Sequence, residues 1–448
     1  MKLKNKIIIL VSVIVLLIAA VIVLTVVSSK YRKNEEYNKV NPVQITSVSS
    51  AVKNFCVTTE EEKYTVTCVE NVWFSPENAN AFLNQEYVEN AFATACSLMA
   101  IPVEMNVASL EKYGLDAPKV SFDFADEAGN KYVLKFGNKV PTGVGYYISV
   151  NDEKNVYIVL NEQYDILCGG LDSLRNKQLI NISSEDFYSI TIKNVNSAVT
   201  VGPKTTNDPN AHSSTIWEMT YPYQKDVDKY AFETKVVNAL DLTIYGFVDD
   251  NPSDYGKYGL DNPKYTIVLE MYKGSFTILL GNTFFSEDGS DTKLIYMQVE
   301  GLPNVFSIKE EQVSYKDLKP VDLLESLVFS RIISCVDTIN YKNAGVSHVL
   351  KVDEPKFYFD DVEVEEGIFR DVYNKIILPV ILGEVTGEVG SEICSFTFNY
   401  NTDTPSETLT FYEYGDLYAA AEVNGNTHFY VKKSNVEDMV NAINNLAE

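Results

Sequence analysis

The chain has 448 residues, enough for about two to four domains with their own hydrophobic cores. It carries 37 Lys and Arg side chains against 62 Asp and Glu, which gives a formal net charge of −25. Nucleic acids are bound through clustered basic side chains, so this composition excludes a nucleic-acid-binding protein and favours a self-repelling, well-solvated surface.

An apolar run without a charged residue extends from Ile7 to Val27. A helix of this length rises about 30 Å, which matches the hydrocarbon core of a bilayer. The apolar segment of a cleaved signal peptide is shorter, about 7–15 residues. We therefore predict an uncleaved transmembrane anchor at 7–27 in the cell membrane, with a cytoplasmic tail at 1–6. A polar stalk at 28–43 would follow, and the C-terminal bulk would lie outside the cytoplasm.

The segment 44–182 is predicted to be the first of three repeats. Ser75-Pro76 supplies a helix cap followed by proline at the first helical position. The run "KVSFDFADEAGNKYVLKFGN" alternates polar and apolar residues around a glycine turn, and "YYISV" and "NVYIV" extend it into an antiparallel meander. Upstream of the meander, apolar residues recur at helical spacing: Val88, Ala91, Phe92, Ala95 and Met99.

The segments 183–328 and 329–448 are predicted to repeat this order, the last in degenerate form. The third copy has a helical pattern in "EEGIFRDVYNKIIL" and a closing helix in "NVEDMVNAINNL". The predicted fold class is α+β: an N-terminal transmembrane helix, then three tandem α+β repeats, each a β-hairpin, an amphipathic helix and an antiparallel β-meander. The helix face predicted for the second copy comprises Phe232, Val236, Ala239, Leu240 and Thr243.

The stretches "KYGLDAPK" and "KYGLDNPK" are almost identical in the first two repeats, and the third lacks them. The glycine closes a helical stretch where a left-handed backbone is needed, the leucine packs against this cap, the aspartate bonds a turn and the proline starts a strand. We therefore predict a folding element; the alternative is a pair of ligand sites built on the tyrosine and the aspartate. The motif residues are Tyr113, Gly114, Leu115, Asp116 and Pro118, then Tyr258, Gly259, Leu260, Asp261 and Pro263.

The six cysteines are scattered without a C-x-x-C pair, and each lies in or beside an apolar run. We predict buried free thiols, because a free cysteine behaves as a small hydrophobe. The alternative is disulfide bonding, with Cys56 and Cys68 as the pair to test first. A zinc site needs Cys and His at short spacing, and the sequence has no such cluster.

No motif in the sequence identifies an enzyme. The patterns G-x-S-x-G, G-x-x-x-x-G-K-[ST] and H-E-x-x-H are all absent. The loop at 286–293 could hold calcium through Glu287, Asp288 and Asp291, but it lacks the spacing of an EF-hand, so a solvated hairpin loop is favoured. We expect neither a cofactor nor a catalytic site, and a hydrolase is a remote alternative.

The helix, the Y-G-L-D-x-P turn, the meander with its F-G-N or L-G-N turn and the strand "VYIV" or "VFSI" resemble the DUF4340 family. The resemblance implies a bacterial, membrane-anchored protein, often linked with auxiliary subunits of gliding-motility-type ABC transporters. It transfers no catalytic residue.

Two functions of different class follow from these patterns. The first is a non-catalytic, membrane-anchored extracytoplasmic accessory or scaffold protein, with a membrane-protein partner such as an ABC transporter permease. The second is a surface module that binds glycans or peptides, because 29 tyrosines supply aromatic faces. A row of exposed tyrosines would favour ligand binding, whereas an exposed apolar patch would favour a protein partner.

Overall fold

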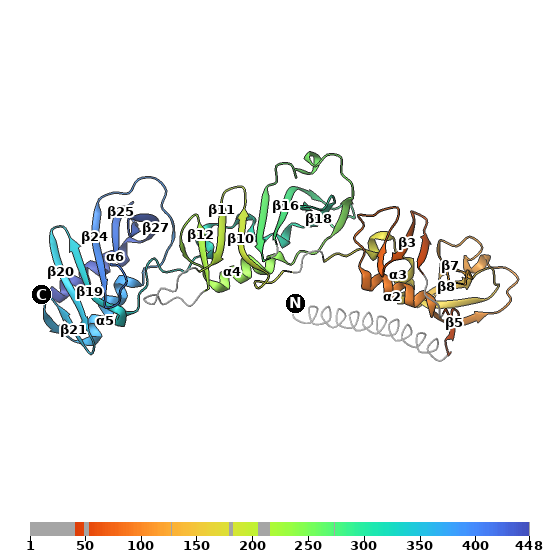
Figure 1. Ribbon diagram of the computed structural model, residues 1–448, viewed down its shortest axis with the longest axis horizontal. Helices are drawn as coiled ribbons and strands as arrows, with labels where there is room; N and C mark the ends of the chain where they lie inside the picture. Colours follow the sequence, from red (N-terminus) through yellow and green to blue (C-terminus); the bar gives the residue numbers. More distant parts are fainter. Residues whose placement is uncertain are drawn as a thin grey trace, which may run out of the picture. The chain divides into compact units, whose positions relative to one another are not determined.

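The computed structural model describes residues 41–48, 53–126, 128–178, 182–204, 216–272 and 274–447 (Figure 1). The predicted tail at 1–6, the predicted anchor at 7–27 and most of the predicted stalk at 28–43 lie outside these residues. No helix within the described ranges has the length and apolar character needed to cross a membrane. The chain divides into two compact units after Lys177.

The predicted α+β class is wrong. Strands make up 43% and helices 21% of the structure, and the strands form three antiparallel sheets of nine strands each. The hairpin predicted to precede each helix is not a separate part, because its first strand pairs with the first strand of the meander. Periodicity identifies a strand and its buried face, but it does not identify the distant strand with which it pairs.

The first sheet has the order β1-β5-β9-β8-β7-β6-β2-β3-β4. It is accompanied by helices α2 (Gln85–Cys96) and α3 (Asn161–Cys168), which contact each other. The strands are β1 (Val43–Gln44), β2 (Asn54–Thr58), β3 (Lys63–Val69), β4 (Val72–Phe74), β5 (Met99–Glu104), β6 (Val120–Ala125), β7 (Lys131–Lys139), β8 (Gly145–Val150) and β9 (Val156–Leu160).

Helix α2 begins nine residues later than the sequence predicts. Its cap is Asn84, whose side chain accepts a hydrogen bond of 3.0 Å from the Tyr87 N–H. Ser75 instead opens a turn, in which its carbonyl accepts from the Asn78 N–H at 3.2 Å. Met99, predicted on the helix face, is an exposed residue of β5. The face that packs into the core comprises Val88, Ala91, Ala95 and Cys96.

The second sheet has the order β13-β12-β11-β10-β15-β16-β17-β18-β14. Its helix α4 (Lys229–Lys235) is short and continues as the 3₁₀ turn η3 (Val237–Leu240), so Thr243 lies beyond the predicted helical face. The strands are β10 (Phe187–Lys193), β11 (Ala198–Pro203), β12 (Trp217–Tyr221), β13 (Lys225–Asp226), β14 (Gly246–Asp249), β15 (Tyr265–Met271), β16 (Gly274–Phe285), β17 (Lys293–Val299) and β18 (Val305–Lys309).

The third sheet has the order β22-β21-β20-β19-β24-β25-β26-β27-β23, and helices α5 (Glu366–Ile377) and α6 (Lys433–Ala447) share its core. The closing helix predicted from "NVEDMVNAINNL" is confirmed as α6. The strands are β19 (Val336–Asn343), β20 (Val346–Asp353), β21 (Lys356–Phe359), β22 (Val362–Val364), β23 (Gly383–Glu384), β24 (Glu392–Tyr400), β25 (Glu407–Tyr414), β26 (Tyr418–Val423) and β27 (Asn426–Lys432).

The three sheets share one connectivity in their central strands, while the first sheet differs at its edges: it has three leading strands instead of four, and strand β1 is added beside β5. In each, the strand that follows the helix (β5, β14 or β23) crosses to the far side of the meander and pairs with the meander's last strand. The second and third repeats also contact each other within the second compact unit. The Tyr223 and Phe429 ring centres lie 4.9 Å apart, and the Ile381 N–H donates to the Ser326 carbonyl at 2.7 Å.

All six cysteines are free thiols, as predicted, but only Cys96, Cys168 and Cys394 are buried, whereas Cys56, Cys68 and Cys335 are partly exposed. Cys56 on β2 lies opposite Thr65 on β3, so the strand register places Cys68 three positions away from the residue that faces Cys56. This register accounts for the absence of a Cys56–Cys68 disulfide.

We expect Phe232→Ala to lower the free energy of unfolding by about 3–5 kcal/mol, because it opens a cavity in the second core. Phe232 is fully buried on α4, with its ring centre 5.2 Å from that of Trp217. Tyr230→Ala is the matched control on the same helix, since Tyr230 is 77% exposed. Guanidinium unfolding of the full-length protein measures both, and equal losses would contradict the placement of α4.

Candidate functional site

The YGLD turn has the same geometry in the first two repeats. The 3₁₀ turn η1 (Glu111–Tyr113) ends at Gly114 with φ +69°, and η4 (Gly256–Tyr258) ends at Gly259 with φ +72°. These are the left-handed conformations predicted for the two glycines. A Cβ at Gly114 would lie 2.7 Å from the Asn138 side chain, and one at Gly259 would lie 2.7 Å from that of Asn282.

The G-N pair within the second strand of each meander, in β7 or β16, packs against this turn. A Cβ at Gly137 would lie 2.3 Å from the Tyr113 carbonyl oxygen, and one at Gly281 would lie 2.2 Å from that of Tyr258. The strand register shifts at both positions, as it does at a β-bulge. The two glycine-containing segments therefore pack backbone against backbone, an association that the paired "YGLD" and "GN" motifs signalled in the sequence.

The motif tyrosines are buried and their hydroxyls are bonded. Tyr113 donates to Glu104 Oε2 at 2.5 Å, and Tyr258 donates to Asp249 Oδ2 at 2.8 Å. The Lys112 ammonium and then the Tyr113 hydroxyl lower the pKa of Glu104 by hydrogen bonding. The Tyr258 hydroxyl does the same for the pKa of Asp249.

The remaining motif residues do not complete a ligand site with these tyrosines. Leu115 and Leu260 are buried beside their tyrosines in small apolar clusters. The motif aspartates are exposed and the prolines are half-buried: Asp116, Asp261, Pro118 and Pro263. The geometry favours the folding role predicted for the motif.

The acidic loop after β16 is held by its own hydrogen bonds. Asp288 accepts from the Ser286 hydroxyl at 2.8 Å, from the Ser290 N–H at 2.9 Å and from the Tyr245 hydroxyl. Bonds from Ser290 and then Tyr245 lower the pKa of Asp288. Glu287 and Asp291 are exposed. Across the described ranges, no three His, Cys, Asp or Glu side chains are grouped so as to hold a metal ion.

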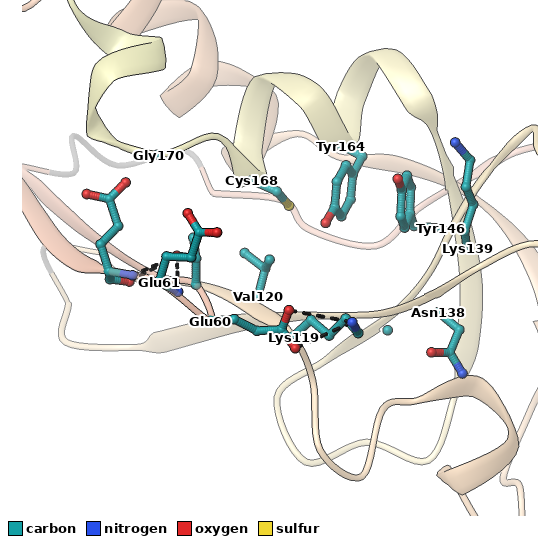
Figure 2. Close-up of a pocket in the computed structure, with 13 residues that line it drawn as sticks. Glu60, Glu61, Lys119, Val120, Asn138, Lys139, Tyr146, Tyr164, Cys168 and Gly170 are labelled. Atoms are coloured by element: carbon teal, nitrogen blue, oxygen red, sulfur yellow. Dashed lines mark hydrogen bonds and ion pairs between the residues drawn. The ribbon is translucent and has the colours of Figure 1, made fainter. Parts of the chain in front are cut away.

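A groove of about 580 Å³ opens beside the first YGLD turn (Figure 2). We call it the tyrosine groove. Its walls come from the β2–β3 hairpin turn, the start of β6, the bulge of β7, strand β8 and helix α3. The lining residues are Thr59, Glu60, Glu61, Glu62, Lys119, Val120, Gly137, Asn138, Lys139, Tyr146, Tyr164, Cys168 and Gly170.

Two stacked rings form the aromatic wall of the groove. Tyr146 on β8 and Tyr164 on α3 have ring centres 3.5 Å apart and planes inclined by 10° (Figure 2). The Lys139 ammonium lies 5.4 Å from the Tyr146 ring centre. Both rings are half-buried, and burial raises the pKa of Tyr164 to about 12, so its hydroxyl stays neutral near pH 7.

Polar groups face this wall across the groove. Glu60 and Lys119 form an exposed ion pair of 3.4 Å, which contributes little to stability. Glu62 is fixed, because its carboxylate accepts from the Leu171 N–H at 2.9 Å. Burial raises the pKa of the Cys168 thiol well above its usual value, so it is not an activated nucleophile. The groove thus offers aromatic, carboxylate, amide and ammonium groups suited to binding.

The second repeat places aliphatic residues where the first places the stacked rings. When the sequences of the two repeats are aligned, β8 with β17 and β9 with β18, Tyr146 corresponds to Ile295 and Tyr164 corresponds to Val313. Ile295 and Val313 are fully buried in the second core. This groove was not predicted from the sequence, although the differences between "YYISV" and "IYMQV" and between "NEQY" and "EEQV" indicate it.

Three sheets that share the connectivity of their central strands, one of them with an open groove, define a mostly β tandem-repeat protein. Residues 73–213 and 217–353 match the family described as "Domain of unknown function (DUF4340)", and the chain belongs to this family. The first match begins in β4, includes the meander of the first sheet and extends past β10 and β11 of the second sheet. The second match begins at β12, includes the meander of the second sheet and ends with β19 and β20 of the third sheet.

The other comparisons add little. A search of the curated proteins finds no match. A solved structure, the glycoside hydrolase family 43 YxiA protein from Bacillus licheniformis, aligns at 9% identity over 88% of this chain and 99% of that chain, with a TM-score of 0.08. A score this low indicates neither a common fold nor a common activity.

We expect Gly114→Val to lower the free energy of unfolding by about 1–3 kcal/mol, because a β-branched residue is strained at positive φ and its Cβ would meet Asn138. Asp116→Asn changes an exposed side chain and should have an effect within about 0.5 kcal/mol. Urea unfolding of the full-length protein compares the two variants. An unchanged unfolding curve for Gly114→Val would argue against the folding role, all the more if Asp116→Asn abolished ligand binding.

Proposed function

We propose that this chain is a non-catalytic binding protein whose tyrosine groove holds a sugar unit of a glycan. The observation that carries the proposal is the stacked Tyr146–Tyr164 pair in an open groove, at positions where the second repeat buries aliphatic side chains. A groove of about 580 Å³ is in the range of small-molecule sites.

Sugars match the chemistry of this groove. Their C–H faces pack on an aromatic ring, as apolar surfaces do, and their hydroxyls bond to carboxylates, amides and ammonium groups. Tyr164 supplies the ring, while Glu61 and Lys119 supply polar groups across the groove (Figure 2). A peptide could use the same aromatic wall, but it presents fewer hydroxyls to the carboxylates.

The placement of the carboxylates supports binding without hydrolysis. Glycosidases generally use two carboxyl groups that flank the scissile bond. Glu60, Glu61 and Glu62 are consecutive residues of one hairpin turn, so the acidic lining residues of this groove lie on a single side.

We expect Tyr164→Ala to weaken glycan binding at least about tenfold, the usual effect of removing a central aromatic contact. The test screens the purified full-length protein against a panel of immobilised oligosaccharides and then measures the best ligand by calorimetry. Tyr272→Ala is the matched control, because Tyr272 is 76% exposed and does not line the groove. Binding to peptides but to no oligosaccharide, or equal binding by both variants, would contradict the proposal.

We infer a second role from the sequence: the protein acts as an extracytoplasmic accessory or scaffold at the cell membrane. The uncharged run at 7–27 supports the anchor, and tandem repeats are a common means of extending a binding surface. The proposed link to an ABC transporter permease rests on the family resemblance. Gentle detergent extraction and affinity purification of the tagged full-length protein should recover a multi-spanning membrane protein, and recovery of this chain alone would contradict the role.

A further inference from the structure

A second cavity, of about 720 Å³, lies inside the second compact unit. We call it the inter-repeat cavity. It is lined by β12 and β13 of the second repeat, by the connection 325–331, and by β26, β27 and the start of β25 of the third repeat. Backbone hydrogen bonds hold the two repeats together beside it: the Val328 N–H donates to the Pro379 carbonyl at 3.1 Å, and the Ile381 N–H donates to the Ser326 carbonyl at 2.7 Å.

The cationic side chains that line this cavity are already satisfied. Lys204 is paired with Asp226 at 2.7 Å, with both groups largely buried. Arg331 makes two parallel bonds with the Glu407 carboxylate, of 2.5 and 2.6 Å. Lys225 donates to the carbonyls of Leu327 at 2.8 Å and Val328 at 3.3 Å.

Burial also reduces the positive charge available from this lining. It lowers the pKa of the Lys225 ammonium to about 8. It lowers the pKa of His428 as well, so this imidazole is neutral near pH 7. Neither group therefore offers an uncommitted positive charge to an anionic ligand.

Glu218 is the exception among the lining acids. Its side chain is 8% exposed, and it forms neither a hydrogen bond nor an ion pair with any residue that the structure describes. The neighbours Trp217 and Met219 on β12 are buried in the second core. Successive side chains of a strand point to opposite faces, so the Glu218 carboxylate points away from that core and toward the cavity it lines.

The charge count of the cavity agrees with this placement. Three cationic side chains, Lys204, Lys225 and Arg331, line the cavity together with four carboxylates, so one negative charge is left over. A carboxylate that lines a cavity without a partner can pair with a cation that enters it. A positively charged ligand would supply the missing partner. The four carboxylates belong to Glu218, Asp226, Glu325 and Glu407.

An organic ammonium group fits this lining better than a metal ion. Calcium takes six to eight oxygen ligands, and no group of three metal-ligating side chains occurs among the described residues. An ammonium group needs one carboxylate and a surface for its carbon chain. The half-buried Tyr223 ring lines the same cavity and offers both an apolar surface and a π face.

We propose that the inter-repeat cavity binds the ammonium group of an amine, with the Glu218 carboxylate as its counter-ion. A lysine side chain of a peptide and a free alkylamine both present this group. The site lies between the second and third repeats, whereas the tyrosine groove lies in the first, and it does not depend on the glycan proposal.

The test measures binding to the full-length protein by calorimetry with three probes. Nα-acetyl-lysine amide represents a peptide side chain, 1,5-diaminopentane represents a free amine, and Nα-acetyl-norleucine amide is the neutral control. We expect at least one amine to bind and the norleucine probe to bind at least about tenfold more weakly. Preference between the two amines identifies the source of the ammonium group.

Glu218→Gln keeps the shape of the side chain but removes its charge, and it should weaken amine binding more than about tenfold. Glu300→Gln, an exposed position at the end of β17, is the matched control and should leave binding unchanged. Equal binding by Glu218→Gln, equal binding of the norleucine probe, or binding of calcium without either amine would overturn the proposal. If Glu218→Gln does not fold, thermal shifts of the unmodified protein with the lysine and norleucine probes decide the question, and equal shifts would overturn it.

Discussion

The pairing of each leading hairpin with the meander that follows it is the contact on which each repeat depends. β2 pairs with β6, β10 with β15 and β19 with β24, which brings Phe55 opposite Phe124 and Ile190 opposite Leu269. Each pairing closes a long loop that contains a helix and an edge strand, so it costs loop entropy and needs a large buried core in return. Phe55 and Phe124 belong to the core of the first repeat, and Ile190 and Leu269 belong to the core of the second.

The YGLD turn belongs to a second, local constraint. In the first two repeats it packs on a glycine at a register shift between the second and third meander strands. The corresponding strands of the third repeat, β25 and β26, pair without a register shift, from Leu409 opposite Val423 to Tyr414 opposite Tyr418. The turn and the bulge are therefore present together or absent together, which a folding element explains and a ligand site does not.

Much of the local structure could be predicted from the sequence, and the long-range structure could not. Val88, Ala91 and Ala95 follow helical spacing and are buried, because that spacing reflects one face of one helix. Met99 and Thr243 continued the spacing by chance and lie outside the helices. The α+β class failed because strand partners far apart in sequence leave no periodic signal.

The tyrosine groove was missed for the same reason. Tyr146 and Tyr164 stack only because β8 and α3 are brought together by the fold. Their residue types gave no motif, since tyrosine is common in strands for its packing alone. The difference between the aligned repeats was visible in the sequence, but its meaning required knowing that the second repeat buries both positions.

Arginine is scarce in this acidic chain, and the three arginines among the described residues are all engaged in the structure. Arg175 donates to the Ala81 carbonyl at 2.6 Å, Arg331 clamps Glu407, and Arg370 bonds Glu366 at 2.7 Å. Guanidinium groups bind carboxylates and carbonyls in fixed geometry, so they suit such junctions. With the strongest cations committed in this way, the excess negative charge is left on the surface and on Glu218, whose carboxylate lines a cavity without a partner among the described residues. A cationic ligand at Glu218 would neutralise one of the negative charges that the composition of the chain leaves in excess.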